Sequence, residues 1–299
     1  MLSIFRQVAG MDTPLKWSVG HGRQIDLDPH LVVGILNVTP DSFYDGGGRT
    51  TAAQSVARAE ELLANGAGMI DIGGESTRPY AEPVDAGSER GRVVPVVRQL
   101  LARNPGTCIS VDTTKSVVAD ACLKAGAEVV NDVSAGALDP ELLDVVAQYR
   151  AGYVLMHSLG GPETMQDNPC YGDVVDEILA FFEHKLGVLT ARGVPEEKIV
   201  LDPGIGFGKR LEHNLEVLRR IESFFSLGRP VYMGLSNKSL WGGLLGLPVE
   251  KRILPTQVAT ALLATRGVRI HRVHEVKEAV QALTISRALK ADGHLGLLV

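Results

Sequence analysis

Eight short apolar runs recur along the chain, and each is separated from the next by a stretch long enough for a helix. Short, continuous apolar runs are typical of strands that are buried on both faces, as in a parallel sheet covered by helices. The runs are 31-LVVGIL, 68-GMIDI, 107-TCISV, 128-EVVND, 152-GYVLM, 198-KIVL, 230-PVYMG and 268-VRIHRV.

Helix-like patterns fill the intervals between these runs. In 52-AAQSVARAEELLANG the residues Ala52, Val56, Ala59 and Leu63 recur at steps of three and four, and Gly66 supplies a C-terminal stop. Eight strand–helix repeats in 299 residues predict a (β/α)₈ TIM barrel rather than an open, doubly wound sheet. The other helix-like stretches cover residues 88–104, 115–125, 139–149, 173–192, 212–226, 255–266 and 275–290.

The segment before the first run, 17-WSVGHGRQIDLD, is typical of a hairpin with a Gly-His-Gly turn. We expect this hairpin to cap the bottom of the barrel. No linker or low-complexity segment interrupts the repeats, so residues 1–299 are predicted to form a single domain, with the barrel proper over residues 31–290.

Composition and charge exclude several classes of function. A net charge of −5 with scattered Lys and Arg provides no basic field for nucleic acid. The three cysteines, Cys108, Cys122 and Cys170, form no C-x-x-C pair, which argues against a disulfide framework and a thiolate zinc site. The chain has no signal-peptide pattern and no apolar run near the about 20 residues that a membrane helix needs. We therefore expect a soluble, cytoplasmic protein with neither membrane nor nucleic acid as a partner.

Polar side chains stand at the end of every one of the eight runs. Active sites of TIM barrels lie at the C-terminal ends of the strands. A single Asp, Asn or Ser after a strand indicates no more than a turn or a helix cap. Polar residues on all eight runs favour a shared functional edge. The residues are Asn37, Asp71, Asp112, Asn131, His157, Asp202, Ser236, Lys238, Arg272 and His274.

The chemistry of this set favours a flat heterocyclic ligand with an anionic group. The carboxylates of Asp112 and Asp202, the amide of Asn131 and the ammonium of Lys238 can pair with N–H and C=O edges, including a guanidine-like edge. Arg272 brings positive charge to the last strand, near the place where barrels commonly bind phosphate.

Nine short motifs, in order along the chain, resemble those of the dihydropteroate synthase family. The resemblance implies a barrel that condenses 6-hydroxymethyl-7,8-dihydropterin diphosphate with 4-aminobenzoate, releasing pyrophosphate and forming 7,8-dihydropteroate for folate synthesis. It also implies Mg²⁺ and a homodimer, for which 255-PTQVATALLATRG is a candidate contact helix. The motifs are 34-GILNVTPDSFYDGG, 71-DIGGESTRP, 111-VDTTK, 129-VVNDV, 155-LMH, 162-PETMQ, 202-DPGIGFGK, 236-SNKS and 272-RVHEV.

The resemblance also assigns residues to a pterin pocket. Asp202 would accept hydrogen bonds from the 2-amino group and the neighbouring ring N–H, Lys238 would donate to the ring carbonyl and a ring nitrogen, and Arg272 would cover the ring. Asp112 would stabilise a methylene cation. The pterin set is Asp112, Asn131, Met156, Asp202, Gly234, Lys238 and Arg272, and the catalytic set is Asp112, Lys238, Arg272 and His274.

The remaining assignments concern the diphosphate, the metal and the second substrate. The resemblance assigns the diphosphate to Asn37, Arg272 and His274, with Asn37 as the ligand of Mg²⁺. The loops 37-NVTPDSFYDGG and 73-GGESTRP would close over the diphosphate and form the 4-aminobenzoate pocket, with Asp41 bearing on the metal or the closed loop. The 4-aminobenzoate set is Thr77, Arg78, Pro79, Phe207 and Ser239.

One departure from the family pattern leaves two other functions open. In 236-SNKS, Asn237 stands where the family usually has arginine, and this puts the affinity for 4-aminobenzoate in question. A non-catalytic pterin-binding paralogue is one alternative, and a methyltetrahydrofolate-dependent methyltransferase is the other. The methyltransferase would not need the diphosphate residues, and intact substrate loops argue against the paralogue.

Overall fold

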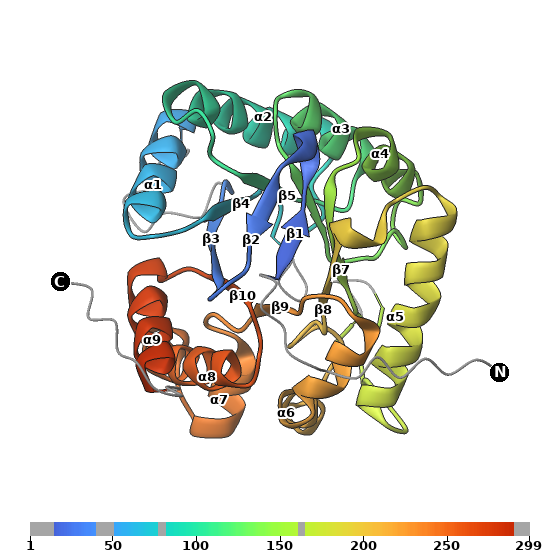
Figure 1. Cartoon of the computed structure of the whole chain (residues 1–299), viewed down its shortest axis with the longest axis vertical. Helices are drawn as coiled ribbons and strands as arrows, with labels where there is room; N and C mark the ends of the chain where they lie inside the picture. The colour runs from blue at the N-terminus through green and yellow to red at the C-terminus, as the bar shows by residue number, and fades with distance from the viewer. Residues whose placement is uncertain (1–14, 40–50, 77–81, 161–164, 290–299) are drawn as a thin grey trace.

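The computed structural model describes residues 15–39, 51–76, 82–160 and 165–289, and its centre is a ring of eight parallel strands (Figure 1). The hydrogen-bonded order is β8-β7-β6-β5-β4-β3-β10-β9, and a parallel bridge between Leu201 and Val231 joins the two ends of that order. The predicted (β/α)₈ barrel is therefore confirmed. The strands are β3 (Leu31–Asn37), β4 (Met69–Gly73), β5 (Ile109–Asp112), β6 (Val129–Asp132), β7 (Gly152–Met156), β8 (Ile199–Asp202), β9 (Tyr232–Gly234) and β10 (Ile270–Val273).

Helices surround the ring of strands (Figure 1). Local sequence fixes their ends, as in the first helix, where the side chain of Thr51 accepts from the backbone N–H of Gln54 and the side chain of Gln54 accepts in return. Gly66 follows the same helix with a φ of 104°, which fits the predicted stop. The helices are α1 (Ala52–Ala64), α2 (Ala86–Arg103), α3 (Ser116–Lys124), α4 (Glu141–Tyr149), α5 (Val174–Ala191), α6 (Leu211–Arg219), α8 (Ile253–Thr265) and α9 (Val276–Leu289).

Two segments differ from the predicted helices. The stretch predicted as one helix over 212–226 divides into α6 and a 3-10 helix, η3 (Ile221–Leu227), because Arg220 leaves helical geometry. A further short helix, α7 (Ser239–Leu245), precedes the 3-10 helix η4 (Val249–Lys251). Its two central glycines weaken the helical pattern, so apolar spacing alone does not reveal it.

The N-terminal hairpin closes the bottom of the barrel, as predicted. Strands β1 (Lys16–Ser18) and β2 (Gln24–Asp26) pair antiparallel and lie across the centre of the ring in Figure 1. The side chain of Trp17 is fully buried, and its Nε1–H donates to the carbonyl of Lys198 at 2.8 Å. The ammonium of Lys198 donates in turn to the carbonyl of Val19 at 2.6 Å, so the hairpin and the bottom of the barrel are joined in both directions.

Alternation along the strands decides which side chains face the barrel interior. Trp17 packs in an interior cluster with apolar residues from the lower ends of the strands, such as Val129 and Ile270. Because strand side chains alternate between faces, the residues two positions later, Asn131 and Arg272, also face the interior but nearer the upper mouth. The same step of two leads from Met69 to Asp71, from Val154 to Met156, from Val200 to Asp202, and from Tyr232 to Gly234.

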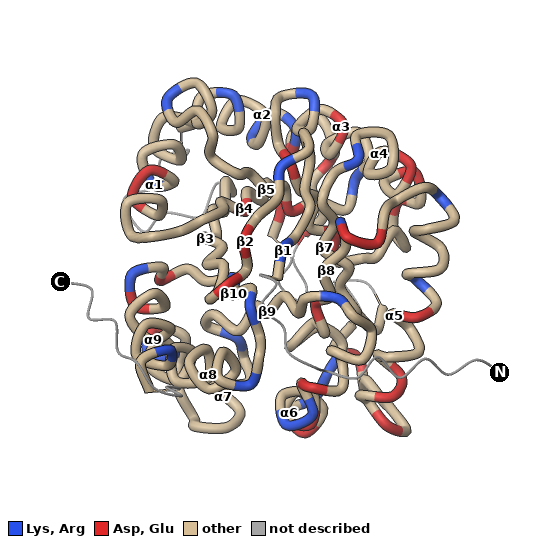
Figure 2. Tube along the Cα trace, viewed as in Figure 1, with Lys and Arg blue, Asp and Glu red and all other residues tan. Residues whose placement is uncertain are grey.

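Charged residues of both signs are interspersed around the ring of helices (Figure 2). Among the described residues, no helix is long and apolar enough to span a membrane.

Candidate active site

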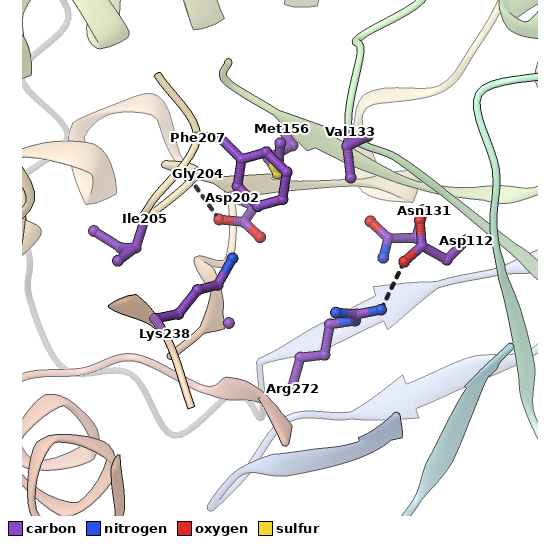
Figure 3. A pocket seen from close by; sticks show the side chains of 11 residues that line it. Asp112, Asn131, Val133, Met156, Asp202, Gly204, Ile205, Phe207, Lys238 and Arg272 are labelled. Carbon is purple, nitrogen blue, oxygen red and sulfur yellow. Dashed lines mark hydrogen bonds and ion pairs between the residues drawn. The ribbon is translucent and has the colours of Figure 1, made fainter. Parts of the chain in front are cut away.

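A pocket opens at the C-terminal ends of the strands and contains all seven residues that were assigned to the pterin (Figure 3). The residues come from six strands and from the segment after β9, which agrees with the alternation described above. The lining consists of Asp112, Asn131, Val133, Met156, Asp202, Gly204, Ile205, Phe207, Gly234, Lys238 and Arg272.

Arg272 joins two buried carboxylates at one side of the pocket. Its Nε donates to Oδ2 of Asp71 at 2.6 Å, and its Nη2 donates to Oδ2 of Asp112 at 2.7 Å. Nδ2 of Asn131 donates to the same oxygen of Asp71 at 2.9 Å. The Asn131 amide is thereby oriented with its carbonyl oxygen left to serve a ligand.

One guanidinium therefore serves two carboxylates that are shielded from water. Burial raises the pKa of Asp112 to about 7; Arg272 acts in the opposite direction, and Asp71 adds to the rise. Burial alone would lower the pKa of Arg272, but Asp71 and Asp112 raise it above its usual value, so the guanidinium stays charged. Among the described residues, Oδ1 of Asp112 is buried and has no hydrogen-bond partner, which leaves an unsatisfied acceptor in the wall of the pocket.

The opposite side of the pocket holds a second pair of charges. Oδ1 of Asp202 accepts from the backbone N–H of Gly204 at 2.7 Å, and burial raises the pKa of this carboxyl. Nζ of Lys238 lies 4.1 Å from the centre of the Phe207 ring, a cation–π contact. Burial lowers the pKa of Lys238 to about 8, so this ammonium exchanges its proton close to neutral pH. Figure 3 shows the ammonium of Lys238 directed toward Asp202 and Phe207.

A buried ammonium fixes the loop between Asp202 and α6. Nζ of Lys209 donates to the carbonyls of Gly204 at 2.9 Å and Phe207 at 3.1 Å, and it lies 3.0 Å from Nδ1 of His157. Burial and the charge of Lys209 lower the pKa of His157 to about 2, so its imidazole is neutral and Nδ1 accepts. His157 thus supports the loop and is absent from the pocket lining.

Lys209 ends the motif 202-DPGIGFGK, but the motif alone does not indicate a role for its side chain. Asp71 was recognised as a strand-end residue, but its link to Arg272 was not foreseen. In each case a charged residue lies beside apolar residues in the sequence. A buried charge of this kind costs free energy unless it has a partner, and this could have indicated a buried ion pair or hydrogen bond.

The residues that the resemblance assigned to the diphosphate lie beside the pocket on neighbouring strands. Asn37 ends β3, which pairs with β10, the strand that carries Arg272. His274 follows β10, and its Nδ1 is 2.9 Å from Oγ of Ser236. Neither Asn37 nor His274 belongs to the pocket lining, so a ligand that reaches both must extend beyond it.

The donor set allows a magnesium ion only with help from a ligand. Among the described residues, no group of three His, Cys, Asp or Glu side chains could hold a metal. Asn37 supplies one amide oxygen, and Mg²⁺ commonly completes its shell with water and phosphate oxygens. The residues therefore fit a magnesium ion that arrives with a diphosphate. Asp41 lies outside the described residues.

Few of the residues assigned to 4-aminobenzoate are described. Phe207 is buried and lines the pocket, whereas Ser239 is exposed at the first residue of α7 and does not line it. Thr77, Arg78 and Pro79 lie outside the described residues. Asn237 has a φ of 57°, a left-handed conformation that asparagine tolerates, and its Nδ2 donates to Oε1 of Glu275 at 2.9 Å.

A family model and individual relatives among known proteins agree on the family of this chain. The family described as pterin binding enzyme matches residues 33–274. The dihydropteroate synthase of Escherichia coli strain K12 is 40% identical over 267 residues, which cover 89% of this chain and 94% of the relative.

Solved structures agree in fold and extent. The dihydropteroate synthase of Xanthomonas albilineans with 4-aminobenzoic acid superposes with a TM-score of 0.87 at 40% identity, covering 94% of this chain and 100% of that chain. The same enzyme in complex with 7,8-dihydropteroate gives a TM-score of 0.83 at 38% identity, covering 93% and 100%.

Gly204 offers a test of how tightly the loop is fixed. It has a φ of 68°, and a Cβ at this position would lie 1.9 Å from the carbonyl oxygen of His157. We expect Gly204→Ala to lower the free energy of unfolding by about 3 kcal/mol or more, measured by urea denaturation.

Gly228→Ala is the matched control, because Gly228 has a φ of 65° and no atom within 4 Å of the added Cβ. Only the left-handed backbone is penalised there, at about 1–2 kcal/mol. Equal losses for the two variants would show that the contact with His157 does not constrain the loop.

Proposed function

Because the chain belongs to the pterin-binding enzymes and, within them, to the dihydropteroate synthases, we infer that it condenses 6-hydroxymethyl-7,8-dihydropterin diphosphate with 4-aminobenzoate, giving 7,8-dihydropteroate and pyrophosphate. The observation that carries this inference is the pocket itself, in which Asp202, Lys238 and Asn131 converge with Arg272 beside them. Neither alternative has a comparable observation in its favour, since the similar proteins are named as synthases.

The pterin is bound by complementary polar edges. Asp202 accepts from the 2-amino group and the adjacent ring N–H, while its bond from Gly204 keeps the carboxylate in place. Lys238 donates to the ring carbonyl and a ring nitrogen. Met156 and Gly234 leave a flat slot for the ring, since one is a buried apolar side chain and the other has none. Arg272 covers the ring, with the N–H groups of Nη1 left for the ligand.

We propose that the bond between the methylene carbon and the diphosphate oxygen breaks first. Pyrophosphate leaves with the bonding electron pair, and the electron-rich dihydropterin stabilises the methylene cation that remains. The neutral amine of 4-aminobenzoate attacks this carbon, forms the new C–N bond and loses one proton to solvent. The carboxylate of Asp112, which lines the pocket, stabilises the cation electrostatically.

The diphosphate extends from the pocket toward Asn37 and His274, with Arg272 between the ring and the anion. Asn37 is the proposed protein ligand of Mg²⁺, and the metal neutralises negative charge on the leaving group when bound. His274 directs Nε2 toward the anion, because the contact between its Nδ1 and Oγ of Ser236 orients the ring. Glu275 orders this region, because its carboxylate accepts from Ser236 at 3.1 Å and from Asn237 at 2.9 Å.

Use of 4-aminobenzoate does not depend on a positive charge at position 237. The amide of Asn237 is engaged with Glu275, and Asn237 does not line the pocket. Phe207 packs against the aromatic ring of the second substrate from the loop that Lys209 holds. Thr77, Arg78, Pro79 and Ser239 remain the proposed contacts on the outer side.

A homodimer is proposed from the apolar surface late in the chain. In α8, Leu254, Val258 and Leu262 recur every four residues with exposed fractions of 73%, 52% and 60%. An exposed apolar stripe of this kind marks an interaction surface, and a second copy with the same stripe gives a self-complementary contact. Further exposed apolar residues lie on α7, η4 and α9, namely Leu244, Leu245, Val249, Ile285 and Leu289.

We also propose a cytoplasmic location, because all three cysteines are free thiols in the structure, as expected in a reducing compartment.

The synthase activity predicts product only when all components are present. We expect pyrophosphate release and dihydropteroate formation from the dihydropterin diphosphate when both 4-aminobenzoate and Mg²⁺ are supplied, and no product with chelator. The measurement is chromatographic detection of dihydropteroate together with a pyrophosphate assay. Tight pterin binding without product would instead indicate the non-catalytic paralogue.

The two pKa values near neutrality predict a narrow pH optimum. Asp112 acts as a carboxylate, so kcat/KM for the dihydropterin diphosphate should rise as pH passes about 7. Lys238 acts as an ammonium, so the same parameter should fall as pH passes about 8. In Lys238→Gln the alkaline limb should disappear along with most of the activity. A kcat/KM that stays constant as pH passes both values would contradict the assigned roles.

The dimer is tested at the centre of its apolar stripe. We expect the wild-type protein to have twice the mass of one chain by light scattering at micromolar concentration, and Val258→Glu to be a monomer because it buries a charge in the contact. Val117→Glu is the control, since Val117 is 54% exposed on α3, away from the stripe. A wild-type monomer, or a dimer that survives Val258→Glu, would overturn the proposal.

A further inference from the structure

A cluster of three charges, one of them fully buried, lies outside the pocket and has no role in the steps above. The ammonium of Lys115 donates to Oε2 of Glu75 at 2.5 Å and to Oε2 of Glu89 at 2.6 Å. The side chain of Glu89 is fully buried, while those of Glu75 and Lys115 are 21% and 23% exposed. A shielded arrangement of this kind is costly unless every charge is paired, so it indicates a positional requirement.

The three residues come from separate elements that meet at the upper rim of the barrel. Glu75 follows β4, Glu89 lies in the first turn of α2, and Lys115 caps the start of α3. Burial alone would lower the pKa of Lys115, but its bonds to the two carboxylates raise the pKa above its usual value, so the ammonium remains charged.

Glu75 also joins the two ends of the loop between β4 and α2. Its second oxygen, Oε1, accepts from the backbone N–H of Val84 at 2.7 Å. One carboxylate thus connects the outgoing end of the loop, the returning end of the loop and Lys115. The loop in between contains Thr77, Arg78 and Pro79 in the sequence.

The outgoing end is fixed on α2 as well. Nη1 of Arg92 donates to the carbonyl of Gly74 at 2.8 Å. A Cβ at Gly74 would lie 2.7 Å from Cγ2 of Val93 and 3.0 Å from Cγ of Glu89, so the backbone lies directly against the helix. The base of the loop, at Gly74, Glu75 and Val84, is therefore held on one side by packing and on the other by the charges of Glu75 and Lys115.

The loop leaves the barrel next to the pocket. A Cβ at Gly73, the last residue of β4, would lie 3.5 Å from Cβ of Asp112 and 3.8 Å from Oδ1 of Asn37. Asp112 lines the pocket, and it is three positions before Lys115 in the same motif. A shift of the loop base would therefore change the space beside the pocket more than the pocket floor.

We propose that Glu75 and Lys115 are positioning residues for 4-aminobenzoate, with Glu89 holding the Lys115 ammonium in place. They touch no substrate; they act by keeping the base of the β4–α2 loop in the arrangement that receives the second substrate. This inference rests on the proposed synthase function. When only a fraction of molecules has the competent loop arrangement, the apparent affinity for the ligand that needs it falls by that fraction.

Glu75→Ala is the informative variant, because the Lys115–Glu89 pair remains and no buried charge is left alone. We expect the KM for 4-aminobenzoate to rise about tenfold, since a charge-assisted hydrogen bond and its neighbour are lost. The kcat should stay within about threefold, and the Kd for the dihydropterin diphosphate within about twofold, because saturating 4-aminobenzoate restores the loop. Glu75→Gln keeps an acceptor for the backbone N–H of Val84, so its KM for 4-aminobenzoate should lie between those of the wild type and Glu75→Ala.

Asp120→Ala serves as the control, because Asp120 also pairs with a lysine, Lys124, and accepts from Tyr149, and none of these residues lines the pocket. Its kinetic constants should match those of the wild type. The inference is overturned if Glu75→Ala leaves the KM for 4-aminobenzoate unchanged, or if pterin binding weakens to the same degree. A wild-type protein that forms no dihydropteroate would instead overturn the synthase function itself.

Discussion

A single guanidinium shared by two buried carboxylates holds the upper mouth of the barrel together. Arg272 on β10 binds Asp71 on β4 and Asp112 on β5, and Asn131 on β6 joins the same network through Asp71. The late strand β10 is thereby joined at one point to β4, β5 and β6, which precede it by more than 130 residues in the sequence. Removing the guanidinium would leave two buried negative charges, a change that typically costs several kcal/mol. Because the network has two carboxylates and one guanidinium, it has a net negative charge, and Asp112 can therefore stabilise a cation that forms in the pocket.

The barrel separates this polar end from a purely structural one. Trp17 and the apolar lower ends of the strands close the bottom by apolar packing, and none of these residues lines the pocket. At the top, hydrogen bonds from two further lysines, the buried Lys209 and the partly buried Lys115, hold the bases of two loops. Lys209 holds the loop that carries Phe207, and Lys115 holds the base of the loop after β4. Burial lowers the pKa of Lys209 to about 7, whereas the two carboxylates raise the pKa of Lys115, so only Lys115 is fully charged at neutral pH.

The sequence was sufficient for the barrel through strand periodicity, for the hairpin cap through its Gly-His-Gly turn, and for the pocket floor through the strand ends together with the family motifs. Residues at alternate positions of a strand share a face, and residues at strand ends meet at one mouth, so Asn131, Asp202 and Arg272 could be grouped without coordinates. The supporting bonds could not be predicted. Lys115 pairs with Glu75 and Glu89 across 40 and 26 residues, and such pairs depend on loop paths that no local pattern specifies. Apolar spacing did not predict the short helix α7, because its two glycines interrupt that spacing.

The most direct test of the central claim, that this pocket recognises a pterin through Asp202, is calorimetric titration of wild type and Asp202→Asn with the dihydropterin diphosphate. The asparagine can still accept from Gly204, so the loop is kept, but its NH₂ group would meet the donors of the pterin instead of accepting from them. The account predicts that Asp202→Asn binds between about tenfold and about a hundredfold more weakly, as expected for hydrogen bonds to a charged group. Equal affinity of the two proteins would contradict it.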